Sequence, residues 1–370
     1  LARYNQDGEL TAWLATEIPT VSNGGVSADL MSITWNITPG IKWSDGSAFT
    51  AHDVVFTGNY CMNPDGGCAQ SNKLADVANI EALDDLTVKV TFSVAKPFPY
   101  GPFVGAEQPI IQKAQFADCM GAKAPECTAE NFGPIGTGPF VVTDFKANDV
   151  ITMEANPHYR DASKPAFASV TFKGGGDAAA AARSVLETGE FDYAWNLQID
   201  PTILSTMAAV GKGTVISSFG TATERLMVNL SNPDPALGNL RSTLEGGPHP
   251  FLTDAAVRRA LSVSIDRNLL AEVGYGAAGK ATCNIVPGPA IYVSTANDEC
   301  LVQDIAKANN ILEAAGWQRG SDGIRAKDGV RLSILYQTST NAVRQDTQAL
   351  VKQWWSEIGV ETELKNISAS

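Results

Sequence analysis

Residues 331–364 read RLSILYQTSTNAVRQDTQALVKQWWSEIGVETEL, and three segments of different character follow one another in them. Residues 331–336 are typical of a strand, and residues 341–358 predict a helix that ends at Gly359. The segment VETEL at 360–364 begins a second strand. A strand, a helix and a strand with short connections favour a parallel sheet. We therefore predict an α/β fold for the last third of the chain.

Two further helices are expected upstream of this stretch. The nearer one covers residues 305–315 and ends at Gly316. The other begins after Thr253 and is expected to be one continuous helix. Its apolar side chains recur every four residues and form one stripe, which must pack on another element. The stripe consists of Val257, Leu261, Ile265, Leu269 and Val273.

The first part of the sequence is rich in strand signals. Residues 31–37 (MSITWNI) and 86–94 (LTVKVTFSV) alternate like half-buried strands. The segment WSDG at 43–46 predicts a turn. Thr50 followed by Asp53 is close to a capping box and predicts the start of a helix.

The sequence pattern changes at Ile135, which predicts the start of a new domain segment. Short strands with turn residues between them are expected from there to residue 173. Asp177 can cap an alanine-rich helix that runs to Thr188, and FDYAW at 191–195 is predicted to be a strand. A helix would thus lead into a strand.

Length and charge exclude several classes of protein. With 370 residues the chain should form two or three globular units, and no window approaches the roughly 18 apolar residues of a membrane span. The chain has 27 Lys and Arg residues and 40 Asp and Glu residues. The resulting net charge of −13 would repel phosphate backbones and anionic lipids. We expect a soluble protein with no nucleic-acid partner.

Six cysteines fall into three couples that are local in sequence, and each couple brackets a loop. Closing such loops would stabilise the chain by roughly 2 to 3 kcal/mol each where thiols oxidise. We therefore predict three disulfides and a location outside the cytoplasm. A zinc site with His52 or His158 and free buried thiols are the alternatives. The predicted couples are Cys61 with Cys68, Cys119 with Cys127, and Cys283 with Cys300.

No string in the sequence predicts catalysis. GYGAAGKA at 274–281 resembles a nucleotide-binding loop, but it follows a predicted helix and Ala281 lacks the hydroxyl that would hold magnesium. The three histidines, His52, His158 and His249, occupy a first helical turn or proline-flanked positions, for which turn or surface roles are expected. We expect no cofactor, no metal and no enzyme, with an extracytoplasmic hydrolase as the less favoured reading.

Several strings, taken in order, resemble one family, the bacterial extracellular solute-binding proteins of family 5, which bind peptides, nickel chelates or opines for ABC importers. The resemblance covers almost the whole chain. It rests on LARYNQDGELTAWLA (1–15), ITWNITPGIKWSDGSAFTAHDVVFTGNY (33–60), PIGTGPFVVTDFKANDVITMEANPHYRD (134–161), FLTDAAVRRALSVSIDRNLLAEVGYG (251–276), NNILEAAGW (309–317) and QALVKQWWSEIGVETEL (348–364).

The resemblance implies a two-lobed α/β periplasmic binding protein (type II, cluster C like) with a ligand cleft between the lobes. Residues 1–19 and 135–227 would form the core of lobe one, and residues 20–134 a β-rich subdomain added to it. Residues 228–370 would form an incomplete lobe two. The family pattern continues at both ends, so we expect the acidic residue that pairs with a peptide's amino terminus to lie beyond Ser370.

The resemblance also implies the function and the partners. The chain would capture an oligopeptide by hinge closure and deliver it to the membrane permease of an ABC importer. A periplasmic or other extracytoplasmic location and a monomeric state are expected. A nickel chelate, an opine or an oligosaccharide is the alternative solute, because one scaffold serves several ligands. A receptor that only senses its ligand is a further alternative.

Ligands of open α/β sheets lie beyond the carboxyl ends of strands, which singles out two loops and one crossover. After FDYAW, Trp195 and Asn196 could hold a peptide, although Trp195 could equally belong to the core. A second group of residues follows the LSILY strand and leads into a helix N-terminus. These residues could bind the ligand there, or they could simply cap the helix. At the lobe crossover, two threonines line either the cleft floor or the hinge. The second group consists of Gln337, Thr338, Ser339 and Asn341, and the third of Thr221 and Thr223.

Overall fold

The computed structural model describes residues 1–5, 8–217, 219–220, 222–288 and 292–368. The chain divides into two compact units, Leu1–Gly175 and Gly176–Ser370. Each unit contains both helices and strands. None of the helices in the described ranges is long and apolar enough to cross a membrane.

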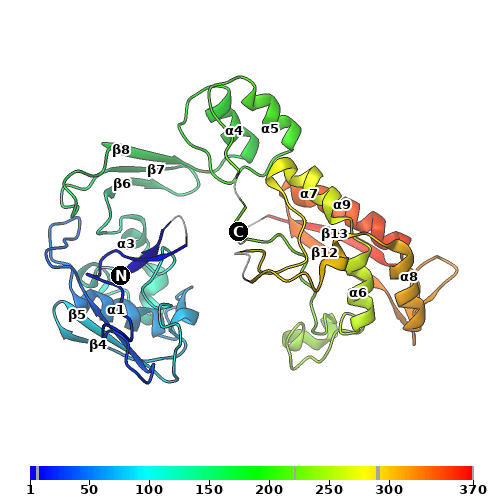
Figure 1. The fold of residues 1–370 in the computed structure, drawn as a ribbon, viewed down its shortest axis with the longest axis horizontal. Helices are drawn as coiled ribbons and strands as arrows, with labels where there is room; N and C mark the ends of the chain where they lie inside the picture. Colours follow the sequence, from blue (N-terminus) through cyan, green and yellow to red (C-terminus); the bar gives the residue numbers. More distant parts are fainter. Residues whose placement is uncertain (6–7, 218, 221, 289–291, 369–370) are drawn as a thin grey trace. The chain divides into compact units, whose positions relative to one another are not determined.

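The first unit consists of three antiparallel sheets and short helices (Figure 1). The sheets have the strand orders β1-β2, β3-β5-β4 and β6-β7-β8. Its elements are β1 (Ala2–Tyr4), β2 (Leu10–Ala12), β3 (Ser32–Asn36), α1 (Ala51–Met62), β4 (Val77–Asp84), β5 (Thr87–Phe92), α2 (Lys113–Phe116), α3 (Thr128–Phe132), β6 (Phe140–Lys146), β7 (Val150–Ala155) and β8 (Ser169–Lys173).

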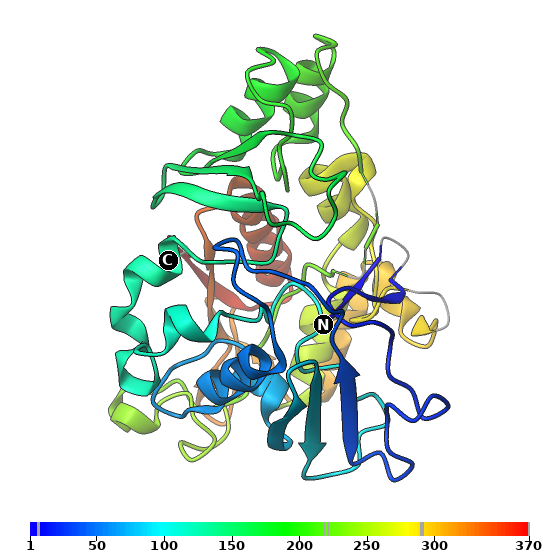
Figure 2. The ribbon, with the colours of Figure 1, turned by 90° about the vertical axis from the view of Figure 1, so that its left-hand side faces the viewer.

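The core of the first unit lies between the β3-β5-β4 sheet and α1. Ile33 and Trp35 of β3 and Val88 and Val90 of β5 are buried, as the alternation in their sequences requires. Helix α1 contacts β4 and β5, and Figure 2 shows it in blue. The strands predicted over 31–37 and 86–94 are confirmed.

The start of α1 and the turn before it follow from local sequence signals. Thr50 and Asp53 form the capping box that their spacing predicts. The Asp53 carboxylate also accepts a hydrogen bond from the Trp43 indole nitrogen at 3.3 Å. Gly46 completes the WSDG turn with φ of 87°, a conformation that glycine adopts without steric cost.

The first residues of the chain pack into this same core. Leu1, Ala2, Leu14 and Ala15 are buried with the side chains of β3 and β5. Sheet β6-β7-β8 follows in sequence and confirms the short strands expected between residues 135 and 173. The assignment of residues 1–19 and 135–227 to one lobe stays a prediction.

The second unit contains the parallel pair that the sequence predicts. Strands β12 and β13 pair in parallel from Ser333 with Glu361 to Ser339 with Ile367, and α9 packs on both strands. Strands β9, β10 and β11 form a small antiparallel sheet. The elements are α4 (Ala178–Leu186), α5 (Pro201–Ala208), α6 (Ala255–Val263), α7 (Arg267–Tyr275), α8 (Ile305–Ala314), β9 (Gln318–Arg319), β10 (Arg325–Lys327), β11 (Val330–Arg331), β12 (Ser333–Ser339), α9 (Ala342–Glu357) and β13 (Glu361–Ile367).

The continuous helix predicted after Thr253 is wrong, because the chain forms two helices there, α6 and α7. The Asp266 side chain accepts a hydrogen bond from the Leu269 backbone N–H at 3.0 Å and begins a second helix. The apolar stripe is divided accordingly. Val257, Leu261 and Ile265 are buried in the core, whereas Leu269 and Val273 are 36% and 41% exposed.

The strand predicted at residues 191–195 is also wrong. Residues 191–200 contain neither helix nor strand, and Asn196, directly after the predicted strand, adopts a positive φ of 56°. The alanine-rich helix before it is confirmed as α4, with Asp177 accepting a hydrogen bond from the Ala180 N–H.

The six cysteines are joined in the three couples that the sequence predicts. Cys61 bonds to Cys68, Cys119 to Cys127, and Cys283 to Cys300. The first two bonds lie in the first unit and the third in the second unit. Each bond closes a loop within one unit.

Candidate ligand-binding site

The group predicted around Ser339 lies at the carboxyl end of β12, and most of it belongs to the strand itself. Strand β12 continues through Ser339, so Gln337, Thr338 and Ser339 do not follow it as expected. Their pairing with β13 extends the strand beyond the predicted end at residue 336. Asn341 lies after the strand and caps α9, where its Oδ1 accepts a hydrogen bond from the Arg344 N–H at 3.2 Å.

Asn341 and Ser339 belong to a larger set of hydrogen-bonded side chains. The Asn341 Nδ2 donates to Gln198 Oε1 at 3.1 Å, which links residues far apart in sequence. Ser339 Oγ accepts from the Asn341 N–H at 3.3 Å and from Arg344 Nη1 at 3.5 Å. Two segments of the second unit therefore meet at the start of α9.

Glu224 and Arg344 form the charged part of this set. Arg344 Nε donates to Glu224 Oε1 at 3.1 Å and its Nη2 donates to Glu224 Oε2 at 3.3 Å. The Tyr275 hydroxyl donates to Glu224 Oε2 at 3.2 Å. We call Gln198, Glu224, Tyr275, Ser339, Asn341 and Arg344 the polar cluster.

The charges of the polar cluster shift the proton affinities of its members. Burial, reinforced by Glu224, raises the pKa of Tyr275 to about 12, so the phenol stays protonated and donates. The Glu224 carboxylate raises the pKa of Arg344. One negative and one positive charge are thus matched, and the amide and hydroxyl groups beside them are neutral.

Trp195 and Asn196 lie three and two residues before Gln198, whose side chain accepts the hydrogen bond from Asn341. The Trp195 side chain is 78% exposed, so the alternative that it belongs to the core is wrong. Asn196 is exposed as well. Leu197 and Ile199 pack against α4 and α5 and thereby fix the course of this segment.

Of the two threonines at the predicted crossover, Thr223 lies within the described residues. Thr221 lies outside the described residues. Thr223 Oγ1 donates to the Ile285 carbonyl at 3.0 Å and so joins two segments of the second unit. The next residue, Glu224, is the one that enters the polar cluster.

Sequence reasoning missed four members of the polar cluster: Gln198, Glu224, Tyr275 and Arg344. Arg344 lies in the first turn of α9, where its position next to the predicted group was a usable signal. Gln198, Glu224 and Tyr275 come from segments distant in sequence, and although Tyr275 lies in the glycine-rich string at 274–281, nothing in that string indicates a contact with Glu224. Their role depends on tertiary contacts.

The strings rejected as catalytic have structural roles. The glycine-rich string at 274–281 follows α7 and contains a 3-10 turn at Gly276–Ala278, with no strand before it. His52 Nε2 lies 3.3 Å from Asp85 Oδ1 on the surface, and His158 is exposed. For His249 a turn or surface role was expected; the surface alternative is wrong because its ring is buried, whereas its Nδ1 accepts hydrogen bonds from two backbone N–H groups of the turn that follows it.

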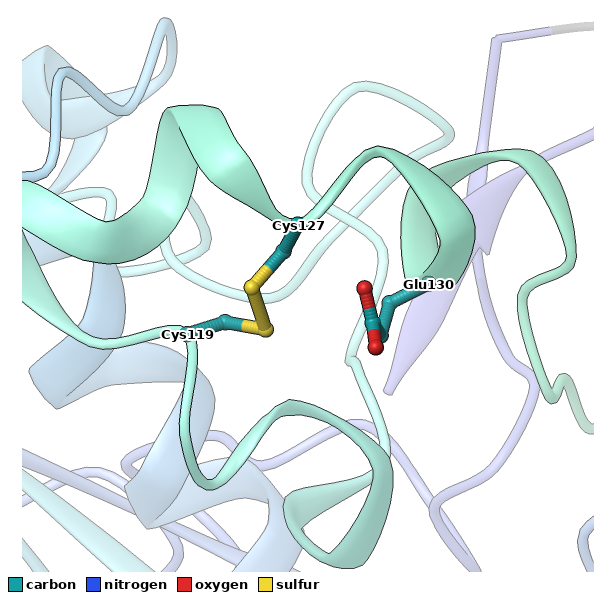
Figure 3. A group of neighbouring side chains, drawn as sticks. All are labelled: Cys119, Cys127 and Glu130. Carbon is teal, nitrogen blue, oxygen red and sulfur yellow. A yellow bond between two sulfur atoms is a disulfide. The ribbon is translucent and has the colours of Figure 1, made fainter.

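Figure 3 shows one group whose side chains lie close enough together to hold a metal ion, the one such group in the part of the chain that the structure describes. It consists of Cys119, Cys127 and Glu130. The two sulfur atoms are bonded to each other, so neither is available as a thiolate ligand. These residues therefore do not fit a metal site.

Comparisons with known proteins place the chain in a family. The model of the bacterial extracellular solute-binding proteins, family 5, matches residues 9–370. Protein XP55 of Streptomyces lividans is 29% identical over 367 residues, which are 99% of this chain and 60% of that protein. The chain therefore spans about three fifths of the length of this relative.

Solved structures confirm the fold class, the α/β fold of two-lobed periplasmic binding proteins. NikZ from Campylobacter jejuni, solved in complex with Ni(L-His), matches with a TM-score of 0.80 and 21% identity, covering 100% of this chain and 68% of that one. The oligopeptide-binding protein AppA from Bacillus subtilis, solved with a nonapeptide, matches with a TM-score of 0.74 and 21% identity over the same shares. The chain belongs to the bacterial extracellular solute-binding proteins, family 5.

Proposed function

We propose that this chain is the solute-capturing part of a bacterial ABC importer, and that it binds oligopeptides and delivers them to a membrane permease. Membership of the solute-binding family supports this role, and the likeness to AppA with its nonapeptide supports the class of solute. We further propose a monomer in the periplasm or another extracytoplasmic space that catalyses no reaction. The three local disulfides support that location.

The polar cluster carries the proposal, because its groups suit a peptide backbone. Glu224 matches the charge of Arg344, which leaves the neutral amides of Gln198 and Asn341 and the hydroxyl of Ser339 beside them. Such groups can donate to a peptide carbonyl and accept from a peptide N–H. They lie at the carboxyl end of a parallel strand pair, where open α/β sheets bind ligands. The exposed indole of Trp195 offers an apolar face for a peptide side chain.

Isothermal titration with defined oligopeptides tests this assignment. The peptides would first be identified by mass spectrometry of what co-purifies with the chain. Ser339→Ala and Arg344→Gln should each weaken peptide binding about tenfold, since each removes a hydrogen-bonding group worth roughly 1 kcal/mol or more. Trp195→Ala should weaken it similarly through lost apolar contact.

Arg183→Gln is the matched control, because Arg183 also pairs with a glutamate in the second unit but lies outside the polar cluster. Its peptide affinity should equal that of the unmodified chain. Unchanged affinity in all three cluster variants would place the site elsewhere.

A nickel chelate is the second candidate solute, which the likeness to NikZ favours. The same titrations with nickel and histidine together, with an opine and with an oligosaccharide decide between the candidates. Saturable binding of one of these without any binding of peptides would replace the peptide proposal.

A further inference from the structure

The first unit contains two arginines, Arg3 and Arg160, and both lie against the ring of Trp13. The Cζ of Arg3 is 3.5 Å from the indole centroid and the Cζ of Arg160 is 4.0 Å from it. Two flat guanidinium groups cannot both lie so close on one face of the ring, so they lie on opposite faces. Arg3 is in β1, Trp13 follows β2, and Arg160 lies between β7 and β8.

This arrangement places two positive charges on the two faces of one indole ring. Neither guanidinium has an ion pair in the part of the chain that the structure describes, and Arg160 Nη1 is buried with no hydrogen-bond partner. Other arginines do have acidic partners, such as Arg344 with Glu224 and Arg259 with Glu299. Arginines of this chain without an ion pair, such as Arg258 and Arg267, donate to backbone carbonyls instead, whereas Arg160 Nη1 has no hydrogen-bond partner among the described residues.

The neighbouring residues do not compensate the two charges. Burial lowers the pKa of the Arg160 guanidinium, and the charge of Arg3 acts in the same direction, whereas Tyr159 and Asp161 act against it. The Asp161 carboxylate accepts hydrogen bonds from Ser163 instead, at 3.0 Å from the backbone N–H and 2.6 Å from Oγ. A buried charged donor without a partner costs folding free energy, and a negative charge bound close to the two guanidiniums would lower that cost.

We propose that Arg3, Trp13 and Arg160 form a binding site for a small anion that carries a carboxylate or phosphate group. A guanidinium donates two parallel N–H groups, which match the oxygens of either anion. The anion would bind at the edge of the indole and accept hydrogen bonds from accessible N–H groups of the two guanidiniums. It would thereby neutralise their mutual repulsion. The site lies wholly in the first unit and does not depend on the proposed peptide capture.

Titration of the full chain with sodium phosphate and, separately, with sodium succinate tests the site and distinguishes the two anion classes. Sodium chloride keeps the ionic strength constant. The readouts are the melting temperature, which rises when a ligand binds the folded chain, and the NMR signal of the Trp13 indole N–H, assigned with Trp13→Phe. Saturable binding of at least one anion is expected. Arg160→Gln and Arg3→Gln should each weaken it tenfold or more.

Lys123→Gln removes the same charge from an exposed position of the first unit and should bind the anion as tightly as the unmodified chain. Arg160→Lys keeps the charge but loses the paired N–H groups, and it should bind several-fold more weakly. This variant keeps the test valid should Arg160→Gln fail to fold. Absence of saturable binding, or equal weakening by Arg160→Gln and Lys123→Gln, overturns the proposal. Lower stability of Arg160→Gln with unchanged anion binding overturns the proposal too. The contact of the two guanidiniums with the Trp13 ring would then only stabilise the fold.

Discussion

His249 is a buried imidazole that serves the backbone as a hydrogen-bond acceptor. Its Nδ1 accepts from the Phe251 N–H at 3.2 Å and from the Leu252 N–H at 3.0 Å, and its ring contacts the Phe251 ring edge-on. An imidazolium has no acceptor, so protonation breaks both bonds. Burial lowers the pKa of His249 below its usual 6.5. The folded chain therefore holds this side chain neutral.

Acidification is expected to remove the stabilisation that His249 provides. Between its lowered folded pKa and the ordinary value near 6.5, the unfolded chain binds a proton that the folded chain does not. The contribution is thus fully present above pH 6.5 and declines as the pH falls through the folded pKa. His249→Ala should lower the free energy of unfolding at neutral pH by about 1–3 kcal/mol, because two buried donors lose their acceptor. The difference between the two proteins, measured by urea unfolding, should shrink towards pH 5.

His158→Ala is the control, since the His158 side chain is exposed and has no ion pair among the described residues. Its stability should run parallel to that of the unmodified chain over the same pH range. A His249→Ala difference that stays constant with pH would contradict the role assigned to the neutral ring.

At single residues, the sequence predicted local hydrogen bonds better than burial. Asn341 and Asp177 cap helices as their positions indicate, because a cap depends on residues three positions away. Trp195 and His249 were harder to place. An indole in an apolar string and a histidine between prolines give no indication of which segments will cover them, and here the first is exposed and the second buried.

Among the elements, the corner between α6 and α7 shows that one N-cap residue can interrupt a regular helical spacing of apolar side chains. Apolar spacing alone continues through residues 264–266, but Asp266 satisfies the first N–H groups of a new helix. Arg267 then fixes the corner, where its Nη1 donates to the carbonyls of Ser262 and Cys300 at 2.9 and 2.8 Å. The corner is therefore specified by two adjacent polar residues.

Asp266→Ala should lower the free energy of unfolding by about 1 kcal/mol, because the N–H of Leu269 loses its acceptor. Asp266→Asn keeps a capping oxygen and should stay within a few tenths of a kcal/mol of the unmodified chain. Urea unfolding followed by circular dichroism measures both. Equal losses in the two variants would show that charge, and not capping, determines the corner.

The elements predicted correctly share local signals. Strand β12, helix α9 and strand β13 follow one another with short connections, and their periodicity predicts both their types and their parallel pairing. The string FDYAW has the composition of a strand, but a strand also needs a neighbour to pair with, and the described part of the chain provides none for it. Of the polar cluster, the sequence singled out Ser339 and Asn341, because both lie near the end of β12, whereas the members from distant segments become neighbours only through tertiary contacts.

At the scale of the whole molecule, the disulfides should stabilise each unit separately. Partners 7, 8 and 17 residues apart close loops that contribute about 2–3 kcal/mol each in the chain-entropy model. Replacing Cys283 and Cys300 together by serine should lower the stability of the second unit by about that amount and leave the first unit unchanged. Hydrogen exchange with mass spectrometry resolves the two units.

Replacing Cys61 and Cys68 together is the reciprocal control, in which faster exchange should be confined to Leu1–Gly175. Peptide mapping without reduction should recover the three local pairs only. Cross-linked peptides between couples, or faster exchange throughout the chain in either double variant, would contradict separate stabilisation.

The short separations within the three cysteine couples also concern the order in which the chain is exposed to an oxidant. Of these six cysteines, a chain that crosses a membrane from its amino terminus presents Cys61 and Cys68 first, then Cys119 and Cys127, and then Cys283 and Cys300. If each cysteine bonds with the next one to emerge, the products are the native pairs. Sequential oxidation during translocation would therefore give the native pairs without a disulfide isomerase, whereas oxidation of these six cysteines only after all of them have emerged allows 15 pairings.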